Sequence, residues 1–392
     1  MSTVGELLKK MLLLFSIPLI LLAAFYFSVL VNLRRGLLCL KPGSHPDHSF
    51  VSVIIAARNE EQNIGSCLES LSLQHYPADR HEIIVVNDRS TDDTAGIVDK
   101  FVKADSRFRL LNIVESNPDM SPKKWALTRG IQQAKGEIIL TTDADCIVKP
   151  GWIASIMRYF EKDVGLVAGF SPLDRYPSAS PFYRLLALES LALAGVAAGS
   201  FGKGFPLTCN GRNLAYRKSV YLQVGGFKSI AHFISGDDDL LLHLVQKNTH
   251  WKLRYAIDQE SFVSAKPPMN FKEFFHQRSR HASKGLYYPN HLKIGLIATY
   301  LFNFSLLGAL FFPTLWPVFL LLFGAKALFE FLLISKAAAL FHNRKLLRFF
   351  PLAIPIHIIY VILLGFWGQV GKFKWKDDYT HPKISSTPRW DG

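Results

Sequence analysis

The stretch IILTTDADC, residues 138–146, decides the fold class of this 392-residue chain. Its apolar start predicts a short strand buried on both faces, and two aspartates one residue apart follow where that strand ends. Two neighbouring carboxylates repel each other unless a positive charge lies beside them. A divalent cation on a diphosphate would satisfy Asp143 and Asp145, because such cations prefer oxygen ligands that phosphates can complete. A capped turn is the alternative, since Asp-x-Asp alone is common by chance.

Predicted strands and helices alternate around this stretch. We expect strands at residues 51–56, 82–86, 110–114 and 137–140. Apolar residues at helical spacing predict helices at residues 64–71, 97–102 and 125–134, the last ending at Gly136 as a left-handed cap. This alternation is typical of an α/β fold with a mostly parallel sheet, which binds ligands beyond the carboxyl ends of its strands.

Apolar segments flank this α/β region and predict membrane helices. Residues 11–31 carry no charge and are long enough to span a bilayer. They exceed a usual signal core and no Ala-x-Ala site follows, so an uncleaved anchor is the better interpretation. Arg34 and Arg35 then place the next segment in the cytosol. Three further spanning helices are expected, at residues 294–312, 315–336 and 348–370.

Two features of the apolar segments need separate interpretation. Residues 184–200 are apolar but short and contain Glu189, so we expect a helix of the soluble domain that lies near the bilayer. Lys326 and Glu330 are one helical turn apart and could pair inside the bundle. Counting crossings puts the basic tail outside the cell, whereas the positive-inside rule puts it inside, and the sequence leaves this conflict open.

The composition favours a membrane partner over nucleic acid. The formal charge is +14, and much of the positive charge flanks apolar segments, as at Lys9, Lys10, Arg344 and Lys345. No basic helix, zinc spacing or aromatic RNA motif accompanies it, so no nucleic-acid partner is expected. The four cysteines form no regular framework and are interpreted as reduced thiols without a zinc site.

These observations predict five segments along the chain. They are an anchor at 1–40, a linker at 41–50, a catalytic domain at 51–290, about three membrane helices at 291–371 and a basic tail at 372–392.

A series of motifs in a fixed order surrounds the two aspartates. The motifs are ARNE (57–60), NDRSTDDT (87–94), KKWAL (123–127), GEII (136–139), NGRNLAYR (210–217), VGGF (224–227), GDDDL (236–240) and QRSRH (277–281). This order resembles the inverting glycosyltransferases of family 2, which have the GT-A fold and include cellulose, chitin and hyaluronan synthases and lipid-linked sugar transferases. The resemblance covers residues 51–286 and implies a GT-A nucleotide-diphospho-sugar transferase domain with flanking transmembrane helices.

The resemblance implies roles for individual residues. Asp88 would bind the nucleotide base, although it could instead cap a helix, and Lys123 would face the pyrophosphate, although it could be a solvated surface lysine. Asp143 would contact the nucleotide side, and with Asp145 it would hold Mg²⁺ or Mn²⁺. Arg280 of the last motif would bind the diphosphate through its bidentate fork. The implied donor-binding set is Ala57, Arg58, Glu60, Asp88, Lys123, Asp143, Arg212, Asn213, Gln277 and Arg280.

The second acidic motif supplies the expected catalytic base. The acceptor hydroxyl must lose its proton as it attacks the anomeric carbon, and a carboxylate can take it. Aligning on Asp239 and Leu240 favours Asp237 as the base, with Asp238 as its rival. Gly236 stands where the family often has Glu, and a capping cluster before a helix is the structural alternative.

We therefore expect a multi-pass membrane enzyme, of a bacterial-type plasma membrane, with its catalytic domain in the cytosol. It would move a sugar, from a UDP-sugar by preference, to a lipid-linked or membrane-associated glycan. A processive polysaccharide synthase is the nearest alternative, but His281 replaces the tryptophan of the last motif. A non-catalytic nucleotide-sugar-binding scaffold is another, and a nucleotidyltransferase would need a glycine-rich loop after the first strand. The sugar, acceptor, linkage and oligomeric state are not determined by the sequence.

Overall fold

The computed structural model describes residues 2–45, 49–176, 180–370, 373–375 and 378–380. The chain forms two compact units, which are described separately. We call Gly36–Pro267 the sheet unit, and Met1–Arg35 together with Pro268–Gly392 the helical unit.

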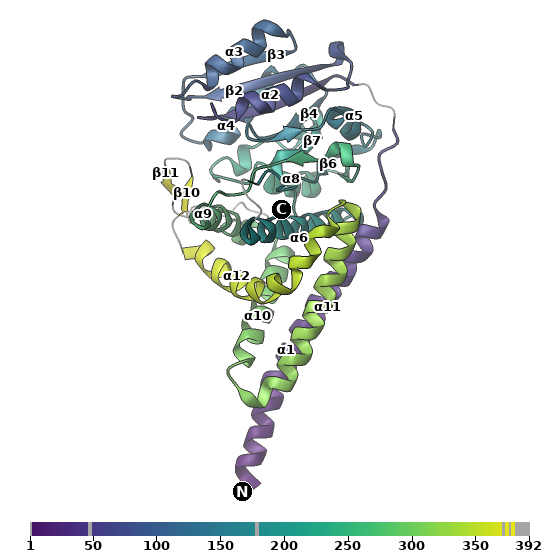
Figure 1. The fold of residues 1–392 in the computed structure, drawn as a ribbon, viewed down its shortest axis with the longest axis vertical. Helices are drawn as coiled ribbons and strands as arrows, with labels where there is room; N and C mark the ends of the chain where they lie inside the picture. Colours follow the sequence, from purple (N-terminus) through teal and green to yellow (C-terminus); the bar gives the residue numbers. More distant parts are fainter. Residues whose placement is uncertain (1, 46–48, 177–179, 371–372, 376–377, 381–392) are drawn as a thin grey trace. The chain divides into compact units, whose positions relative to one another are not determined.

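A seven-stranded sheet forms the core of the sheet unit (Figure 1). Its strand order is β3-β2-β1-β4-β7-β6-β8. β7 pairs antiparallel with both of its neighbours, and all other pairs are parallel. The strands are β1 (Val51–Ala57), β2 (His81–Asp88), β3 (Phe108–Ile113), β4 (Ile138–Thr141), β6 (Val164–Gly169), β7 (Leu214–Arg217) and β8 (Lys252–Ala256). The predicted mostly parallel α/β sheet is confirmed.

Helices connect the strands, because parallel neighbours need a crossover. The apolar face of α4 packs on β1 and β2, α2 packs on α3 and β5, and Ile64, Leu68 and Leu127 are buried. The helices of this unit are α2 (Ile64–Ser72), α3 (Thr94–Ala104), α4 (Pro122–Gln133), α5 (Trp152–Met157), α6 (Pro181–Gly202), α7 (Lys218–Gln223) and α8 (Asp239–Asn248). A second small sheet pairs β5 (Ile147–Val148) with β9 (Val263–Ser264).

The predicted left-handed cap at Gly136 is wrong. Helix α4 ends at Gln133, Ala134 is already extended, and Gly136 is not among the residues with positive φ. A close backbone contact explains why residue 136 is a glycine, since a Cβ there would lie 2.4 Å from the backbone nitrogen of Ser52. Gly136 therefore lets the chain pass close to the start of β1 before it enters β4.

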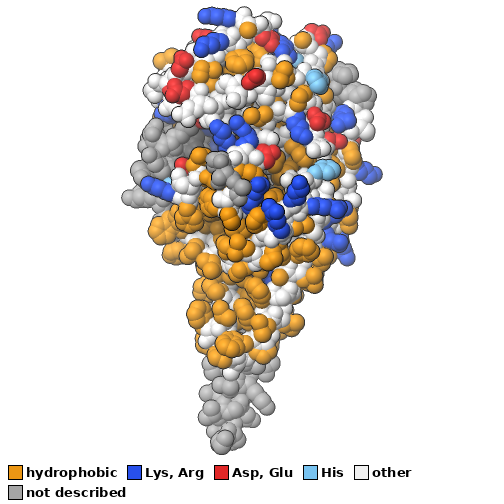
Figure 2. Space-filling model, in the orientation of Figure 1, with side chains coloured by type: hydrophobic (Ala, Val, Ile, Leu, Met, Phe, Trp, Pro, Cys, Tyr) orange, Lys and Arg blue, Asp and Glu red, His pale blue; other side chains and the backbone are white. Residues whose placement is uncertain are grey.

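The helical unit contains long apolar helices whose outer surfaces carry exposed hydrophobic side chains (Figure 2). In each of these helices, only 22–28% of the most apolar stretch of 18 residues is buried. The helices are α1 (Ser2–Cys39, whose last residues belong to the sheet unit), α10 (Asn290–Ala309), α11 (Trp316–Leu340) and α12 (Phe350–Val370). All four are long and apolar enough to cross a membrane.

Helix α6 meets the same length and composition criteria but differs in burial. The most apolar stretch of 18 residues in α6 is 61% buried, and the helix packs on β8 within the sheet unit. The end of α1 approaches it closely, since a Cβ at Gly36 would overlap the carbonyl of Gly199. This burial supports the prediction that residues 184–200 form a helix of the soluble domain.

The boundary between the two compact units lies at residue 267, and the predicted end of the catalytic domain at residue 290 stays a prediction. Helix α9 (Phe271–Ala282) belongs to the helical unit, because it packs on α12. The ring centroids of Phe274 and Tyr360 are 5.8 Å apart, and those of Phe275 and Trp367 are 5.9 Å apart. Of the predicted basic tail, the structure describes only the short hairpin β10 (Phe373–Trp375) and β11 (Asp378–Thr380). Residues 46–48 of the predicted linker also lie outside the described residues.

The predicted pairing of Lys326 with Glu330 is confirmed, and it extends to two further helices. Glu330 also accepts a hydrogen bond from the Tyr26 hydroxyl of α1. His357 of α12 lies 3.4 Å from the Lys326 amine and 3.6 Å from the Glu330 carboxylate. We call these four residues the helix-bundle cluster.

Candidate functional site

Two loops at the carboxyl edge of the sheet are bound to each other. Val51–Ala57 and His81–Asn87 pair in parallel register, so β1 and β2 end side by side. Asn59 and Arg89 follow those ends with φ of 53° and 55°, which non-glycine residues rarely adopt. The Asn59 amide donates to the Ser90 hydroxyl at 3.0 Å, and the Asn59 side-chain oxygen accepts from the Thr91 amide at 2.8 Å. Strained backbone of this kind is typical of ligand-binding loops.

Asp88 lies at the end of β2 with its side chain 5% exposed. One carboxylate oxygen accepts from Nε of Arg89 at 2.8 Å. The alternative role of Asp88 as a helix cap is not found, because helix α3 has Asp93 at its N-cap. The Asp92 carboxylate accepts a hydrogen bond from the Thr94 amide at 3.1 Å, in the loop between β2 and α3.

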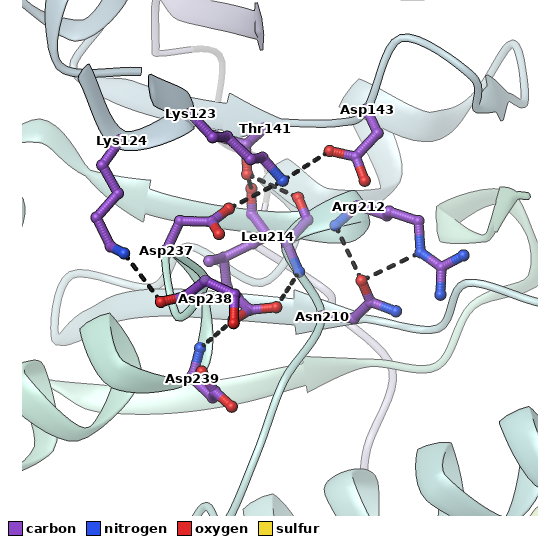
Figure 3. Close-up of polar contacts among 12 residues, drawn as sticks. Lys123, Lys124, Thr141, Asp143, Asn210, Arg212, Leu214, Asp237, Asp238 and Asp239 are labelled. Atoms are coloured by element: carbon purple, nitrogen blue, oxygen red, sulfur yellow. Dashed lines mark hydrogen bonds and ion pairs between the residues drawn. The ribbon is translucent and has the colours of Figure 1, made fainter. Parts of the chain in front are cut away.

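An acid–lysine cluster lies beyond β4, and Figure 3 shows its contacts. The Lys123 amine is 2.8 Å from Oδ1 of Asp143 and 3.0 Å from Oδ2 of Asp237. We use the name acid–lysine cluster for these three residues. Burial alone would lower the pKa of the lysine amine, but the two carboxylates raise it above its ordinary value. Lys123 is therefore not a solvated surface lysine, and it joins the two acidic motifs that lie 94 residues apart.

The two aspartates of the first motif have opposite electrostatic environments. Burial alone would raise the pKa of Asp143, but Lys123, with a contribution from Arg212, lowers it. Burial raises the pKa of Asp145, and the negative charge of Asp143 raises it further. Its Oδ1 accepts from Cys146 Sγ at 3.5 Å. A cation at Asp145 would relieve this unfavourable charge.

The donor set therefore fits a divalent cation that phosphate oxygens complete. Within the part of the chain that the structure describes, no three His, Cys, Asp or Glu side chains gather to hold a metal by themselves. Two carboxylates from one strand end, one of them with a raised pKa, match a cation shared with a diphosphate. The predicted metal ligands Asp143 and Asp145 stay a prediction with this support.

The three aspartates before α8 have different partners. Asp238 caps the helix, since its carboxylate accepts from the Asp239 amide at 2.7 Å and from the Gly211 amide at 3.1 Å. Asp239 is buried. Asp237 extends to Lys123, with its side chain 10% exposed. The capping alternative thus holds for Asp238, and this leaves Asp237 as the better candidate for the base.

Arg212 and Asn213 are neighbours that face different surroundings. Asn213 is buried, and its amide donates to the carbonyls of Phe170 at 2.9 Å and Ser261 at 2.7 Å. Its side-chain oxygen accepts from the Trp152 indole at 3.0 Å. These bonds give Asn213 a structural role within the sheet unit, and its contact with the donor stays a prediction. Arg212 is half-buried beside the cluster, where its Nε donates to the Asn210 side chain at 3.2 Å.

The remaining predicted donor-binding residues lie in three places. Ala57 is the buried last residue of β1, and Arg58 and Glu60 follow it in the first loop. Gln277 and Arg280 lie on α9 in the helical unit, whereas the acid–lysine cluster comes from the sheet unit alone. Their contact with the donor stays a prediction.

Three basic residues near the site were missed by the sequence analysis. Arg89 pairs with Asp88, Arg175 donates to the Asp145 carbonyl at 2.8 Å, and Lys124 donates to backbone carbonyls before Asp237. Arg89 and Lys124 lie within the motifs at 87–94 and 123–127, and this membership was the available signal. Arg175 follows β6 in an irregular segment with no recognisable pattern.

Two family models match this chain. The model described as glycosyl transferase family 2 matches residues 52–221, and the one described as glycosyl transferase family group 2 matches residues 138–367. The second covers more than half of the chain and runs from β4 into α12.

Curated relatives and a solved structure agree with these models. YdaM of Bacillus subtilis, a probable glycosyltransferase, is 28% identical over 243 residues, which are 60% of this chain and 55% of that protein. The glycosyltransferase AglE of Haloferax volcanii is 29% identical over 230 residues, 56% of this chain and 68% of that protein. A mannosyltransferase of Pyrobaculum calidifontis, solved with GDP-Man and Mn²⁺, is 19% identical, covers 90% of this chain and 99% of its own, and has a TM-score of 0.57. The last similarity shows the shared GT-A fold.

Proposed function

Because this chain belongs to glycosyltransferase family 2, we propose that it transfers a sugar from a nucleotide-sugar to an acceptor hydroxyl with inversion at the anomeric carbon. The proposal rests on one observation: the Lys123 amine lies within 3.0 Å of a carboxylate from each of the two acidic motifs. One carboxylate belongs to the expected donor site and the other is the expected base. Transfer requires donor and base to be this close, because the acceptor oxygen must contact both in one step.

Donor binding is assigned to the carboxyl edge of the sheet. Asp88 would accept from the base, with its carboxylate held in place by Arg89. Lys123 and Arg212 would balance the diphosphate charge. Asp143 and Asp145 would hold a divalent cation, which when bound supplies charge stabilisation to the departing diphosphate. That one solved relative in fold carries GDP-Man and Mn²⁺ supports a nucleotide-sugar and a cation here, with a UDP-sugar as our expected donor.

The proton transfer is assigned to Asp237. Its Oδ2 lies 3.0 Å from the Lys123 amine, so Oδ1 is the oxygen expected to accept the proton of the acceptor hydroxyl. Attack from the face opposite the leaving diphosphate would invert the configuration. Asp238 would keep the base in place, because it ties the start of α8 to Gly211.

We also propose that the acceptor is a lipid-linked or membrane-associated glycan and that the sheet unit lies in the cytosol. Four long apolar helices of the helical unit support membrane attachment. Arg34 and Arg35 near the end of α1 support a cytosolic sheet unit, where nucleotide-sugars are made available.

A donor screen tests the reaction. Purified protein would be given UDP-, GDP- and dTDP-sugars with Mg²⁺ or Mn²⁺ and a membrane lipid extract, and nucleotide release would be measured. Release from one donor class, and its loss in Asp237→Asn, is the expected result. Tight donor binding without release or transfer would instead favour the non-catalytic scaffold.

Cysteine labelling tests the orientation. Ser44 and Thr314 are exposed, in the linker and between α10 and α11. In a Cys39→Ser background, Ser44→Cys should resist a membrane-impermeant thiol reagent in intact cells, whereas Thr314→Cys should be labelled. The reverse pattern would overturn the cytosolic placement.

A further inference from the structure

Lys124 is a fully buried lysine that the proposed mechanism does not use. It follows Lys123 in the first turn of α4. Its amine donates to the carbonyl of Phe233 at 2.5 Å and to the carbonyl of Ser235 at 2.9 Å. Buried lysines are rare and costly unless they are hydrogen-bonded, so these carbonyls explain its burial.

The two carbonyls belong to a loop that carries the expected base. Residues 231–238, which we call the base loop, have no regular secondary structure between a short 3₁₀ turn (Lys228–Ile230) and α8. The start of α4 bonds this loop at four points along its length. The Ser121 amide donates to the Ala231 carbonyl at 2.8 Å, Lys124 contacts Phe233 and Ser235, and Lys123 contacts Asp237.

A sharp turn separates the Lys124 contacts from the base. Gly236 has φ of +93°, which favours glycine, and a Cβ there would lie 2.5 Å from Cδ1 of Leu240. The Ser235 carbonyl is therefore fixed by Lys124 immediately before the turn, and Asp237 emerges immediately after it. Figure 3 shows both lysines extending from α4 toward this region.

We propose that Lys124 is a positioning residue that sets the place of Asp237 by holding the backbone of the base loop. The two adjacent lysines then have separate tasks. Lys123 contacts the carboxylates themselves, and Lys124 determines where one of them stands. The inference rests on the proposed function, since it gives Asp237 the role of base.

Lys124→Met tests this proposal, because methionine keeps an apolar side chain of similar length and removes both donated hydrogen bonds. Misplacing a reacting group by about 1 Å can cost roughly 10²-fold, so we expect kcat to fall by about 10- to 100-fold. Donor Kd, measured by calorimetry, should stay at the wild-type value because Lys123, Asp143 and Asp145 are unchanged. Lys100→Met, at an exposed lysine of α3, is the matched control and should alter neither.

Hydrogen–deuterium exchange gives a readout independent of activity. Amides of residues 231–238 should exchange faster in Lys124→Met, while β1 and β4 exchange as in the wild type. If the wild-type protein releases nucleotide from no donor, the proposed function fails, and the exchange result still decides whether Lys124 holds the base loop.

Two further variants keep the proposal falsifiable if Lys124→Met does not fold. Lys124→Gln retains an uncharged NH₂ group that can still donate to the loop carbonyls, so it should give a smaller loss of kcat. Gly236→Ala strains the same loop from its own side, so it should lower kcat without changing donor Kd, and the double variant should lose less than the product of the single effects. A folded Lys124 variant with wild-type kcat, or one whose donor affinity falls as far as its kcat, would overturn the proposal.

Discussion

Each unit of the protein contains a lysine that contacts carboxylates, and the two lysines differ in exposure. The Lys123 side chain is 26% exposed and its partner Asp143 is 32% exposed. The Lys326 side chain is fully buried and its partner Glu330 is 8% exposed. A ligand can reach the first cluster, whereas the Lys326–Glu330 pair of the second is buried, although the His357 side chain beside it is 39% exposed.

The partners differ as well. Lys123 bridges two loops of the sheet unit, and next to it burial and Asp143 raise the pKa of Asp145 despite the opposing charge of Arg212. The helix-bundle cluster joins α1, α11 and α12 through Tyr26, Glu330 and His357. The exposed acid–lysine cluster is therefore the one that we propose binds the donor, whereas the buried Lys326–Glu330 pair joins helices of the helical unit.

Removing the cation should have the largest effect on the acid–lysine cluster. EDTA should reduce nucleotide release to background, and added Mg²⁺ or Mn²⁺ should restore it. Asp145→Asn should lose activity while the protein stays folded, as checked by thermal unfolding. Asp119→Asn, at an exposed aspartate, is the control and should stay active. Full turnover in EDTA would contradict the metal assignment.

Loss of the base should have the next largest effect. Asp237→Asn keeps the size and hydrogen bonding of the side chain but cannot take a proton, so transfer should fall about 10²–10⁴-fold. Donor affinity by calorimetry should persist.

Asp238→Asn is the comparison variant for the base, because asparagine can still cap α8 but has one acceptor oxygen and so loses either the Asp239 or the Gly211 bond. Transfer should then fall much less than in Asp237→Asn. If Asp238→Asn is the inactive variant and Asp237→Asn is not, the assignment of the base is wrong by one residue.

Lys123→Met should weaken donor binding directly. A hydrogen bond to a charged group contributes about 1.5–3 kcal/mol, which corresponds to roughly a 10- to 100-fold higher donor Kd. Lys100→Met should bind donor normally, and calorimetry measures both. An unchanged Kd in Lys123→Met would remove this lysine from the donor site.

Lys326→Met should have the smallest effect on catalysis and act on stability instead. It leaves Glu330 without its cationic neighbour on α11, and breaking a buried pair costs about 3–5 kcal/mol. Thermal unfolding in detergent should show the loss, while donor Kd stays unchanged.

The double variant Lys326→Met with Glu330→Leu should recover much of that stability, because an apolar pair can replace a buried ion pair. Lys336→Met, at a half-buried lysine elsewhere on α11, is the control. If Lys326→Met abolished donor binding, the division between the acid–lysine cluster and the Lys326–Glu330 pair would fail.

Much of the sheet could be predicted from the sequence. The expected strand at 82–86 lies within β2, and the strand expected at 137–140 overlaps β4, with ends shifted by a few residues. Strand and helix periods are local properties of the chain, so a short window carries them. The pairing of Lys326 with Glu330 was also predictable, because residues one turn apart on a helix face each other.

Other features depended on segments distant in sequence. Gly136 was predicted as a helix cap, but the nearby backbone of Ser52 explains it. Asn213 was predicted in the donor site, and the structure adds its bonds to Trp152, Phe170 and Ser261. Helix α9 was predicted in the catalytic domain, and the structure adds the packing of its aromatic side chains on α12. None of these partners is recognisable from the local pattern.

The sequence by itself determined the α/β class, the order of the motifs and the apolar helices, because burial periodicity and composition are written along the chain. Only the tertiary structure determined which of two adjacent motif residues faces the site. Lys123 and Lys124 are adjacent and identical in type, yet one reaches Asp143 and the other the carbonyl of Ser235, 111 residues away. Adjacent residues on a helix point in directions about 100° apart, so their partners are set by the distant segments that pack there.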